Sequence, residues 1–266
     1  MPPSASPEPV ACARQEDGIE VWLLRYDRPL GVAGARNRGL EHARGEVVVF
    51  SDAHNDVPPG WWPPIVATLN RPGVGIVGPA FGIMGEKSAA KSSGQRIADR
   101  TLRVEWLPYL GTEPHPVPTL GGGFMAARRA VLDAAGAFDD GMPQWGSEDL
   151  EICLRYWLLG YEVWAVPEVE VAHYFRDASP YQVQYVHVIH NTLRTALLHL
   201  NEERVAHVLH AYMQHPHYAR ALARCTTSDL GRRREALLAQ RVHDDDWFFQ
   251  HPYFRDIEME LRGTTA

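Results

Sequence analysis

VVVFSDAH, residues 47–54, places an apolar run directly before the triplet Asp52-Ala53-His54. An apolar run without alternation is typical of a strand that is covered on both faces of a sheet. Because open α/β folds bind ligands at the carboxyl edge of their strands, Asp52 and His54 are predicted to lie at a ligand site. A carboxylate oxygen and an imidazole nitrogen together suit a divalent ion such as manganese. The triplet is common by chance, so this interpretation depends on the surrounding sequence.

The sequence on both sides of this strand predicts an alternation of helices and strands. Residues 31–45 read GVAGARNRGLEHARG, in which small and apolar residues recur near helical spacing and Gly45 is suited to end a helix. After a proline-containing turn, residues 61–69 are expected to form a second helix and residues 74–77 a second strand. This order is typical of an α/β domain. Residues 82–100 are polar and rich in small residues, so they are expected to form a mobile surface segment, and residues 126–135 are expected to form a short helix that ends at Gly136.

A second group of candidate residues begins with the triple glycine 121–123, where the backbone can approach a ligand closely because no β-carbon intervenes. Further along, Glu148 and Asp149 open a predicted amphipathic helix over residues 147–160. The two acids have a structural interpretation, because acids in the first turn after a Ser147 N-cap stabilise a helix by about 0.3–1 kcal/mol each. The other interpretation is a catalytic acid/base pair, which the preceding Trp-Gly and triple glycine favour.

The histidines and arginines of the chain also have two interpretations. His173 and Arg176 follow a strand-like segment, and each alone would be read as a structural histidine or a surface charge. His173 and Arg176 become candidate site residues only in combination with the Asp-x-His triplet. Other histidines lie in helix-like stretches of the last third and are expected in the core or on the surface rather than at a second metal site. They are His187, His190, His199, His207 and His210.

Composition limits the class of protein. The chain has 266 residues, 45% of them hydrophobic and 22% charged, which suits one α/β domain with a helical extension. Its formal charge of −7 argues against nucleic-acid binding, which needs a basic face. Three widely spaced cysteines indicate neither a disulfide framework nor a thiolate zinc site. Without a signal-peptide layout or an apolar stretch of about 18 residues, the protein is predicted to be soluble and cytoplasmic.

Three stretches together resemble glycosyltransferases of the GT-A fold in the family-2 superfamily, most closely the polypeptide N-acetylgalactosaminyltransferases. They read GARNRGLEHARGEVVVFSDAH from residue 34, PTLGGGFMAARRAVLDAAGAFDDGMPQWGSEDLEICLRYWLLGYEV from residue 118, and VAHYFR from residue 171 with a later Pro-Tyr. The resemblance implies a mixed, mostly parallel sheet flanked by helices. It divides the chain into an irregular or disordered tail (1–18), a catalytic domain (19–180) and a C-terminal helical extension (181–266).

The resemblance also implies a role for individual residues. The residues that match the ligands of Mn2+, or of another divalent cation, are Asp52, His54 and His173. The residues that match the binding site of the nucleotide-sugar donor are Arg36, Gly122, Gly123, Arg176 and Tyr181. The residues that match the catalytic loop facing the acceptor are Trp145, Glu148 and Asp149.

By this resemblance the protein is an enzyme, a glycosyltransferase of class EC 2.4. It is expected to move a sugar from a nucleotide-diphosphate donor, with UDP favoured, to the hydroxyl of a saccharide, a peptide or a small molecule. Relative to the membrane-anchored members, a soluble, bacterial-type enzyme without a transmembrane anchor is expected. A non-haem iron oxygenase with two histidines and a carboxylate is the other metal enzyme considered, and the α/β flanks disfavour it because such oxygenases use a jelly roll.

Two departures from the family pattern leave alternatives open. The family motif has Asn at the position of Asp149, whereas Asp is common there in inverting enzymes, so retention and inversion of the sugar's configuration both stay open. The strand-like residues 19–26 lead straight into the helix at residue 31, so the first strands, which contact the nucleobase, are expected to be missing. The alternative function is therefore a catalytically impaired GT-A-like binding protein or a truncated fragment without the nucleobase site. An exposed sheet edge is expected there, which would favour homo-oligomers.

Overall fold

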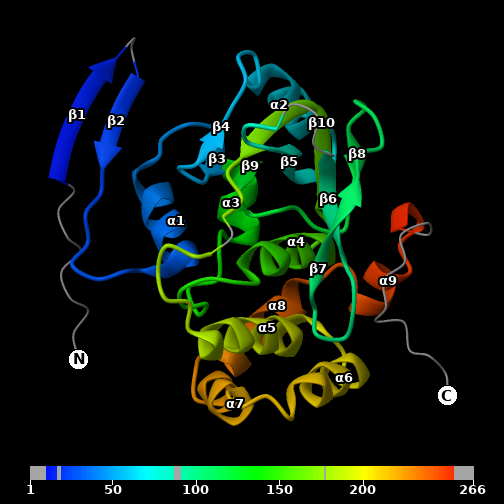
Figure 1. The fold of residues 1–266 in the computed structure, drawn as a ribbon. Helices are drawn as coiled ribbons and strands as arrows, with labels where there is room; N and C mark the ends of the chain where they lie inside the picture. The colour runs from blue at the N-terminus through cyan, green and yellow to red at the C-terminus, as the bar shows by residue number, and fades with distance from the viewer. Residues whose placement is uncertain (1–9, 17–18, 87–90, 177, 255–266) are drawn as a thin grey trace.

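The computed structural model describes residues 10–16, 19–86, 91–176 and 178–254 (Figure 1). The strands are β1 (Val10–Glu16), β2 (Ile19–Leu23), β3 (Val47–Ser51), β4 (Asn55–Asp56), β5 (Val74–Ile83), β6 (Ser92–Ile97), β7 (Val104–Pro108), β8 (His115–Pro116), β9 (Phe124–Arg128) and β10 (Glu162–His173). The helices are α1 (Gly31–His42), α2 (Trp62–Leu69), α3 (Arg129–Ala135), α4 (Glu148–Leu158), α5 (Tyr185–His199), α6 (Glu202–Tyr212), α7 (Tyr218–Thr226), α8 (Leu230–Gln240) and α9 (Asp245–Phe249), with a 3-10 turn at Pro252–Phe254.

The main sheet is mixed, as predicted. Its central order is β3-β9-β5-β10-β4; β6 pairs with β5 and with β7, and β8 pairs with β10. Strands β3, β5 and β10 run in the same direction, but β9 lies antiparallel between β3 and β5. Among the described strands, β5 and β10 form the one parallel ladder. The mostly parallel character therefore holds for the direction of these three strands and not for the pairing of neighbours.

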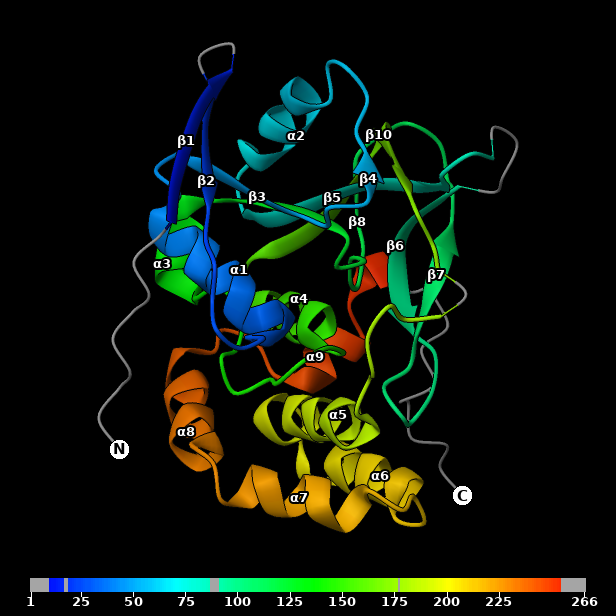
Figure 2. The same ribbon diagram turned by 60° about the vertical axis from the view of Figure 1, so that its left-hand side comes forward.

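The sheet lies between helices on its two faces, in an α/β arrangement that both ribbon views show (Figures 1 and 2). Helix α2 covers one face, where Ile65 and Leu69 are completely buried against β5 and β9. Helices α1, α3 and α4 cover the other face. Strand β3 contributes to both interfaces, because Val48 and Phe50 point into one core cluster while Val47 and Val49 pack against the other.

The C-terminal helices form a further layer beneath α4 (Figure 2). Helix α5 contacts α4 on one side and α6, α7 and α8 on the other. Leu154 of α4 and Leu193 of α5 belong to the same buried cluster. The helical layer thus shares its hydrophobic core with the sheet. The predicted division at residue 180 remains a prediction.

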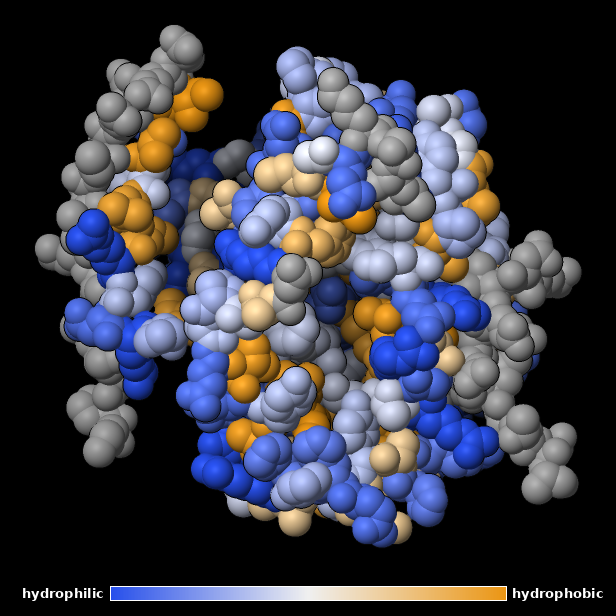
Figure 3. Space-filling model, in the orientation of Figure 1, coloured by the Kyte–Doolittle hydropathy of each residue, from blue (hydrophilic) through white to orange (hydrophobic). Residues whose placement is uncertain are grey.

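Strand β3 is an edge strand, as expected from the sequence. Its ladder partner among the described strands is β9 alone. The strand at Ile19–Leu23 does not join this edge but pairs with β1 in a separate two-stranded hairpin. Figure 3 shows apolar side chains on this hairpin, which stands clear of the main body in that view. These side chains are Ile19, Val21, Trp22 and Leu23, each at least 42% exposed.

Three segments differ from the sequence-based expectation. The tail at 1–18 was expected to be irregular, but residues 10–16 form β1, because the backbone of β2 offers them a ladder partner; residues 1–9 and 17–18 lie outside the described part. The segment 82–100 was expected to be a mobile surface segment, but residues 92–97 form β6, with Ser93 and Gln95 buried. Residues 126–128 were expected in a helix and belong to β9, because they pair with β3, and Ala126 and Ala127 pair with β5 as well.

None of the helices within the described residues combines the length and the apolar character that crossing a membrane requires.

Candidate active site

Three side chains from distant parts of the chain meet at the carboxyl ends of β3 and β10. Atoms of Asp52, His54 and His173 that could bind a metal all lie within 4.8 Å of one another. The Nε2 atom of His54 is 3.8 Å from Oδ2 of Asp52, and Nε2 of His173 is 3.6 Å from the same oxygen. In the described part of the chain this is the one group of three or more such side chains. One carboxylate and two imidazoles at these separations fit a divalent cation.

Backbone pairing explains why these residues meet. Strand β4 runs antiparallel to the end of β10, so that Asn55 lies opposite His173. The backbone N–H of Asp52 donates to the carbonyl of Gly123 at 2.9 Å, and the Asn55 side-chain amide donates to the same carbonyl at 2.7 Å. The two ends of the triad are therefore fixed against the triple glycine. A β-carbon on Gly123 would lie only 3.1 Å from the ring of His173, which is tighter than an ordinary contact, so glycine favours this approach.

The surroundings of His173 favour the neutral imidazole that a metal requires. Burial, followed by the charge of His54, lowers the pKa of His173 below its ordinary value. Phe81 and Phe175 pack edge-on or tilted against the ring, with centroids 6.0 and 4.3 Å away. The Nδ1 atom is buried and has no hydrogen-bond partner among the residues that the structure describes.

Arg36 of α1 reaches into the same site. One of its terminal nitrogens, NH2, donates to Oδ1 of Asp52 at 3.1 Å and to the carbonyl of Gly122 at 2.6 Å. The guanidinium lies 5.0 Å from the ring centroid of Phe138, a cation–π contact that holds it in place. The other terminal nitrogen, NH1, is buried, and no described residue accepts a hydrogen bond from it. Arg36 thus retains unused donor capacity for an anion.

Glu148 and Asp149 enter the site from the first turn of α4. Asp149 accepts the backbone N–H of Gly122 at 3.1 Å, and Glu148 accepts that of Gly146 at 2.7 Å. Burial, followed by the negative charge of Asp149, raises the pKa of Glu148 to about 7. Burial also raises the pKa of Asp149 above its ordinary value. The pair can therefore hold a proton near neutral pH, as an acid/base site must.

The structural interpretation of the two acids is only partly realised. Ser147 stands at the N-cap position with a left-handed backbone (φ 63°), and its side chain makes no capping hydrogen bond within the described chain. Its hydroxyl lies 3.0 Å from that of Thr192 in α5 instead. The acids still lie in the first helical turn, where the helix dipole favours negative charge.

All eleven residues predicted for the site line a single cavity of about 660 Å³. They are Arg36, Asp52, His54, Gly122, Gly123, Trp145, Glu148, Asp149, His173, Arg176 and Tyr181. Their individual roles remain predictions, but the cavity contains them all.

Other residues that line the cavity or hold its walls carried no recognisable signal in the sequence. Phe81 and Trp106 form an aromatic wall, with ring centroids 5.3 Å apart, and both lie in segments where an aromatic residue reads as ordinary packing. Gln144 and Asn191 hold the loop before α4 through hydrogen bonds to backbone atoms. Asn55 could have been found, because it follows His54 directly at the end of the strand.

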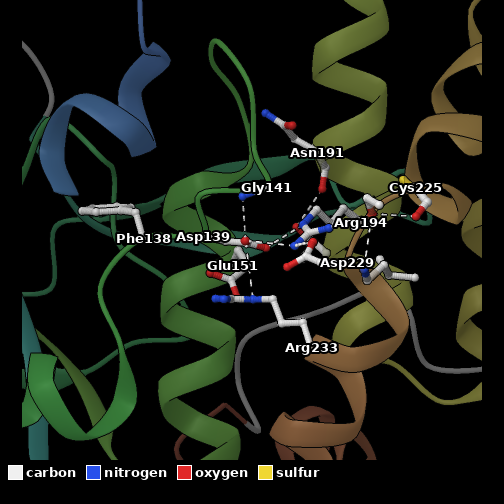
Figure 4. A network of polar contacts seen from close by, with 12 residues as sticks. Phe138, Asp139, Gly141, Glu151, Asn191, Arg194, Cys225, Asp229 and Arg233 are labelled. Atoms are coloured by element: carbon white, nitrogen blue, oxygen red, sulfur yellow. Dashed lines mark hydrogen bonds and ion pairs between the residues drawn. The ribbon is translucent and has the colours of Figure 1, made fainter. Parts of the chain in front are cut away.

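The histidines of the last third do not form a second metal site within the described residues. His190 and His199 are buried, as expected of core residues. The Nε2 atom of His199 lies 2.9 Å from Oε1 of Glu151, beside a second buried network around Asp139 and Arg194 (Figure 4). The first contact joins α4 to α5, and the second network joins the loop before α4 to α5.

Comparisons with known proteins agree with this geometry. A family model described as "Glycosyl transferase family 2" matches residues 3–136, half of the chain. Polypeptide N-acetylgalactosaminyltransferase 11 of Xenopus tropicalis is 29% identical over 264 residues, covering 93% of this chain and 42% of the relative. Polypeptide N-acetylgalactosaminyltransferase 13 of Homo sapiens is 28% identical over 177 residues, covering 61% and 32%. The chain therefore spans less than half the length of these relatives. Both come from animals, which gives no support to a bacterial-type enzyme.

A solved structure described as GalNAc-T7 with UDP, GalNAc and Mn2+ is similar to this chain with a TM-score of 0.71 and 21% sequence identity. The match covers 86% of this chain and 45% of that one. This likeness confirms the predicted GT-A fold.

Proposed function

The chain belongs to glycosyl transferase family 2, and we propose that it is a metal-dependent glycosyltransferase. In the proposed reaction a sugar passes from a nucleoside-diphosphate donor to an acceptor hydroxyl, and the nucleoside diphosphate leaves. We assign UDP as the nucleotide and Mn2+ as the metal, because the similar solved structure is described with UDP, GalNAc and Mn2+.

One observation carries the proposal: Asp52, His54 and His173 converge in a cavity that also contains Arg36 and two buried carboxylates. These three side chains would hold the metal. When bound, a divalent cation supplies positive charge that neutralises a leaving diphosphate. Arg36 adds a fixed guanidinium with a free nitrogen, which can donate charge-assisted hydrogen bonds to phosphate oxygens.

Glu148 and Asp149 are proposed to handle the proton of the acceptor hydroxyl. Their carboxylates are adjacent in sequence and repel each other, so the pair binds a proton more tightly than an isolated carboxylate does. Because the pKa of Glu148 lies at about 7, the pair can both accept and release a proton under ordinary conditions.

Trp145 and Tyr181 are proposed to close the cavity over the donor. Both line the cavity, and both are about half exposed, at 48% and 52%. Aromatic side chains in such positions can cover a ligand and exclude water, which would otherwise hydrolyse the activated sugar.

Isothermal titration calorimetry tests this function. UDP is expected to bind in the presence of Mn2+ and to bind much more weakly after chelation with EDTA. Binding of iron with 2-oxoglutarate would indicate the oxygenase instead, an outcome that the GT-A fold disfavours. If neither nucleoside diphosphates nor 2-oxoglutarate bind, the enzymatic proposal fails, and the alternative of a catalytically impaired GT-A-like binding protein is favoured.

A further inference from the structure

The loop before α4 has an unusual backbone. Gln144, Gly146 and Ser147 all have positive φ angles, of 57°, 104° and 63°. A left-handed conformation is costly for residues with a β-carbon. Gln144 and Ser147 therefore keep this conformation only because surrounding contacts hold them in it. The loop carries Trp145 into the cavity and leads directly to Glu148.

The Gln144 side chain bridges this loop to the segment that contains Tyr181. Its Nε2 donates to the carbonyl of Gln182 at 2.8 Å, and its Oε1 accepts the backbone N–H of Gln184 at 2.9 Å. The Nδ1 atom of His187 lies 3.4 Å from the same oxygen. Because Gln184 is the N-cap residue of α5 and makes no side-chain cap in the described chain, Gln144 supplies the acceptor at this end of the helix.

The backbone of Gln144 makes a third connection, to the helix that carries Arg36. Its carbonyl accepts the backbone N–H of Val32 at 2.7 Å. The segments around Gly31 and Gln144 approach so closely that a β-carbon on Gly31 would lie 2.5 Å from the backbone nitrogen of Gln144. The left-handed backbone of Gln144 therefore directs the carbonyl toward α1 and the side chain toward α5.

The rest of the loop is held from α5. The side-chain amide of Asn191 donates to the carbonyls of Pro143 and Gly146, at 3.0 and 2.9 Å. The Gln144 side chain takes no part in these bonds. The Gln144 amide is consequently the contact that links the two covering side chains, Trp145 on its own loop and Tyr181 on the neighbouring segment.

We propose that Gln144 is a positioning residue that fastens the segment of residues 181–184 to the Trp145 loop and so holds Tyr181 over the nucleotide-sugar donor. This inference rests on the proposed function for the identity of the ligand. The fastening itself is a property of the contacts above. By holding the segment in place before the donor arrives, Gln144 reduces the ordering that donor binding requires.

Gln144→Asn is the decisive variant. Asparagine tolerates a left-handed backbone better than most residues, so the loop keeps its shape. Its side chain is one methylene shorter and no longer reaches both Gln182 and Gln184. The matched control is Gln182→Ala, because only the backbone carbonyl of Gln182 takes part in the contact.

Amide hydrogen exchange tests the contact without relying on activity. In Gln144→Asn the backbone amide of Gln184 is expected to exchange about tenfold faster, the effect of losing one to two net hydrogen bonds. The amide of Val32 should keep its protection, because it bonds to the backbone carbonyl of residue 144. Unchanged exchange at Gln184 in Gln144→Asn would overturn the proposal.

Kinetics and binding test the consequence. Gln144→Asn is expected to raise the KM for the donor, and the Kd for UDP with Mn2+, by about tenfold with a smaller change in kcat. Gln182→Ala should behave like the wild type. An unchanged donor affinity in Gln144→Asn, or an equal loss in Gln182→Ala, would contradict the positioning role. If the wild type binds no nucleotide at all, the proposed function fails, and hydrogen exchange alone then decides whether the contact exists.

Discussion

Two clusters of this protein contain the same kinds of side chain and differ in how completely they are paired. The cavity cluster of Asp52, His54, His173 and Arg36 has side chains that are 11–32% exposed. It retains buried nitrogens on His173 and Arg36 for which the described residues provide no partner. The network of Figure 4, which we call the closed network, centres on the buried pair of Asp139 and Arg194. Its one buried nitrogen without a hydrogen bond to a described residue is Nε of Arg233, which still lies 3.4 Å from Oδ1 of Asp139.

In the closed network, Arg194 makes a bidentate ion pair with Asp139, with hydrogen bonds of 2.7 and 3.1 Å. Both side chains are at most 1% exposed. It also reaches Asp229 at 2.9 Å and the Ser228 hydroxyl at 3.1 Å. Buried polar groups that are fully paired rigidify a structure, whereas groups left unpaired are costly unless a ligand completes them. The difference therefore indicates which cluster binds something and which one supports the fold.

Helix α4 lies between the cavity and the buried polar groups of the C-terminal helices, and two of its glutamates show the same contrast within one turn. Glu148 faces the cavity, where burial raises its pKa to about 7. Glu151 faces the closed network, where burial alone would raise its pKa, but Arg155 and His199 outweigh that effect and hold the pKa below its ordinary value. Two glutamates three residues apart thus have opposite preferences for a proton.

The largest expected effect comes from breaking the open cluster. Asp52→Ala removes the oxygen shared by both histidines, and several kcal/mol of transition-state stabilisation with it, so we expect metal-dependent sugar transfer to fall by at least about 1000-fold. Manganese titration should show the loss of the site, while thermal unfolding should change little. Asp56→Ala is the matched control, because Asp56 is an exposed acid in the adjacent β4 and lies outside the triad. Turnover in Asp52→Ala equal to that of the control would refute the ligand assignment.

Breaking the closed network should affect stability and not metal binding. Arg194→Met leaves Asp139 buried with the partly exposed Arg233, 3.4 Å away, as its remaining charged partner, which is expected to lower the free energy of unfolding by about 3 kcal/mol. Asp229→Asn should cost far less, because the side chain of Asp229 is 42% exposed. Urea unfolding measures both variants, and manganese affinity is compared in the folded protein. If Arg194→Met proved as stable as Asp229→Asn, the network would not support the fold.

The smallest expected effect sharpens the contrast between the two glutamates. The pKa of Glu148 is raised from 4.5 to about 7, so the folded state holds its proton more tightly and stability is lost as the pH rises through this window. Glu148→Gln should remove that loss. The lowered pKa of Glu151 acts in the opposite sense, because its contribution is present above 4.5 and is lost as the pH falls below that value.

These two effects can be separated by measuring the free energy of unfolding across the pH range. The proteins compared are the wild type, Glu148→Gln and Glu151→Gln. Glu151→Gln is expected to reduce the loss of unfolding free energy below pH 4.5. Glu148→Gln is expected to reduce the loss between pH 4.5 and about pH 7. The same reduction in both variants would mean that the two glutamates are not in different environments.

Much of the fold could be predicted from local patterns. The helix expected over 147–160 is α4, and the helix expected over 61–69 is α2, because apolar spacing and glycine stops act within a few residues. Strand β9 was missed over residues 126–128, because an alanine-rich segment favours a helix locally and only pairing with β3 and β5 makes it a strand. Strand β6 was missed because its residues are polar, and they become buried only when distant segments such as β5, β7 and Thr119 pack against them.

The residues of the candidate site likewise fall into those that short motifs reveal and those whose roles depend on distant segments. The Asp-x-His triplet, the triple glycine and the acidic pair could be identified in the sequence, because each motif is short and its chemistry lies in adjacent residues. The positions of Gln144 and Asn191 could not, because their hydrogen bonds reach segments 38 and 45 residues away.

The sequence by itself determined which groups are available for chemistry: a carboxylate, two imidazoles, a guanidinium and a pair of acids on strand and helix ends. Only the tertiary structure decided that these groups share one cavity, and that Asp139 pairs with Arg194 and Glu151 with Arg155 instead. The physical reason is that spacing along the chain sets local conformation, whereas pairing and burial depend on segments that meet only when the sheet and the C-terminal helices pack together.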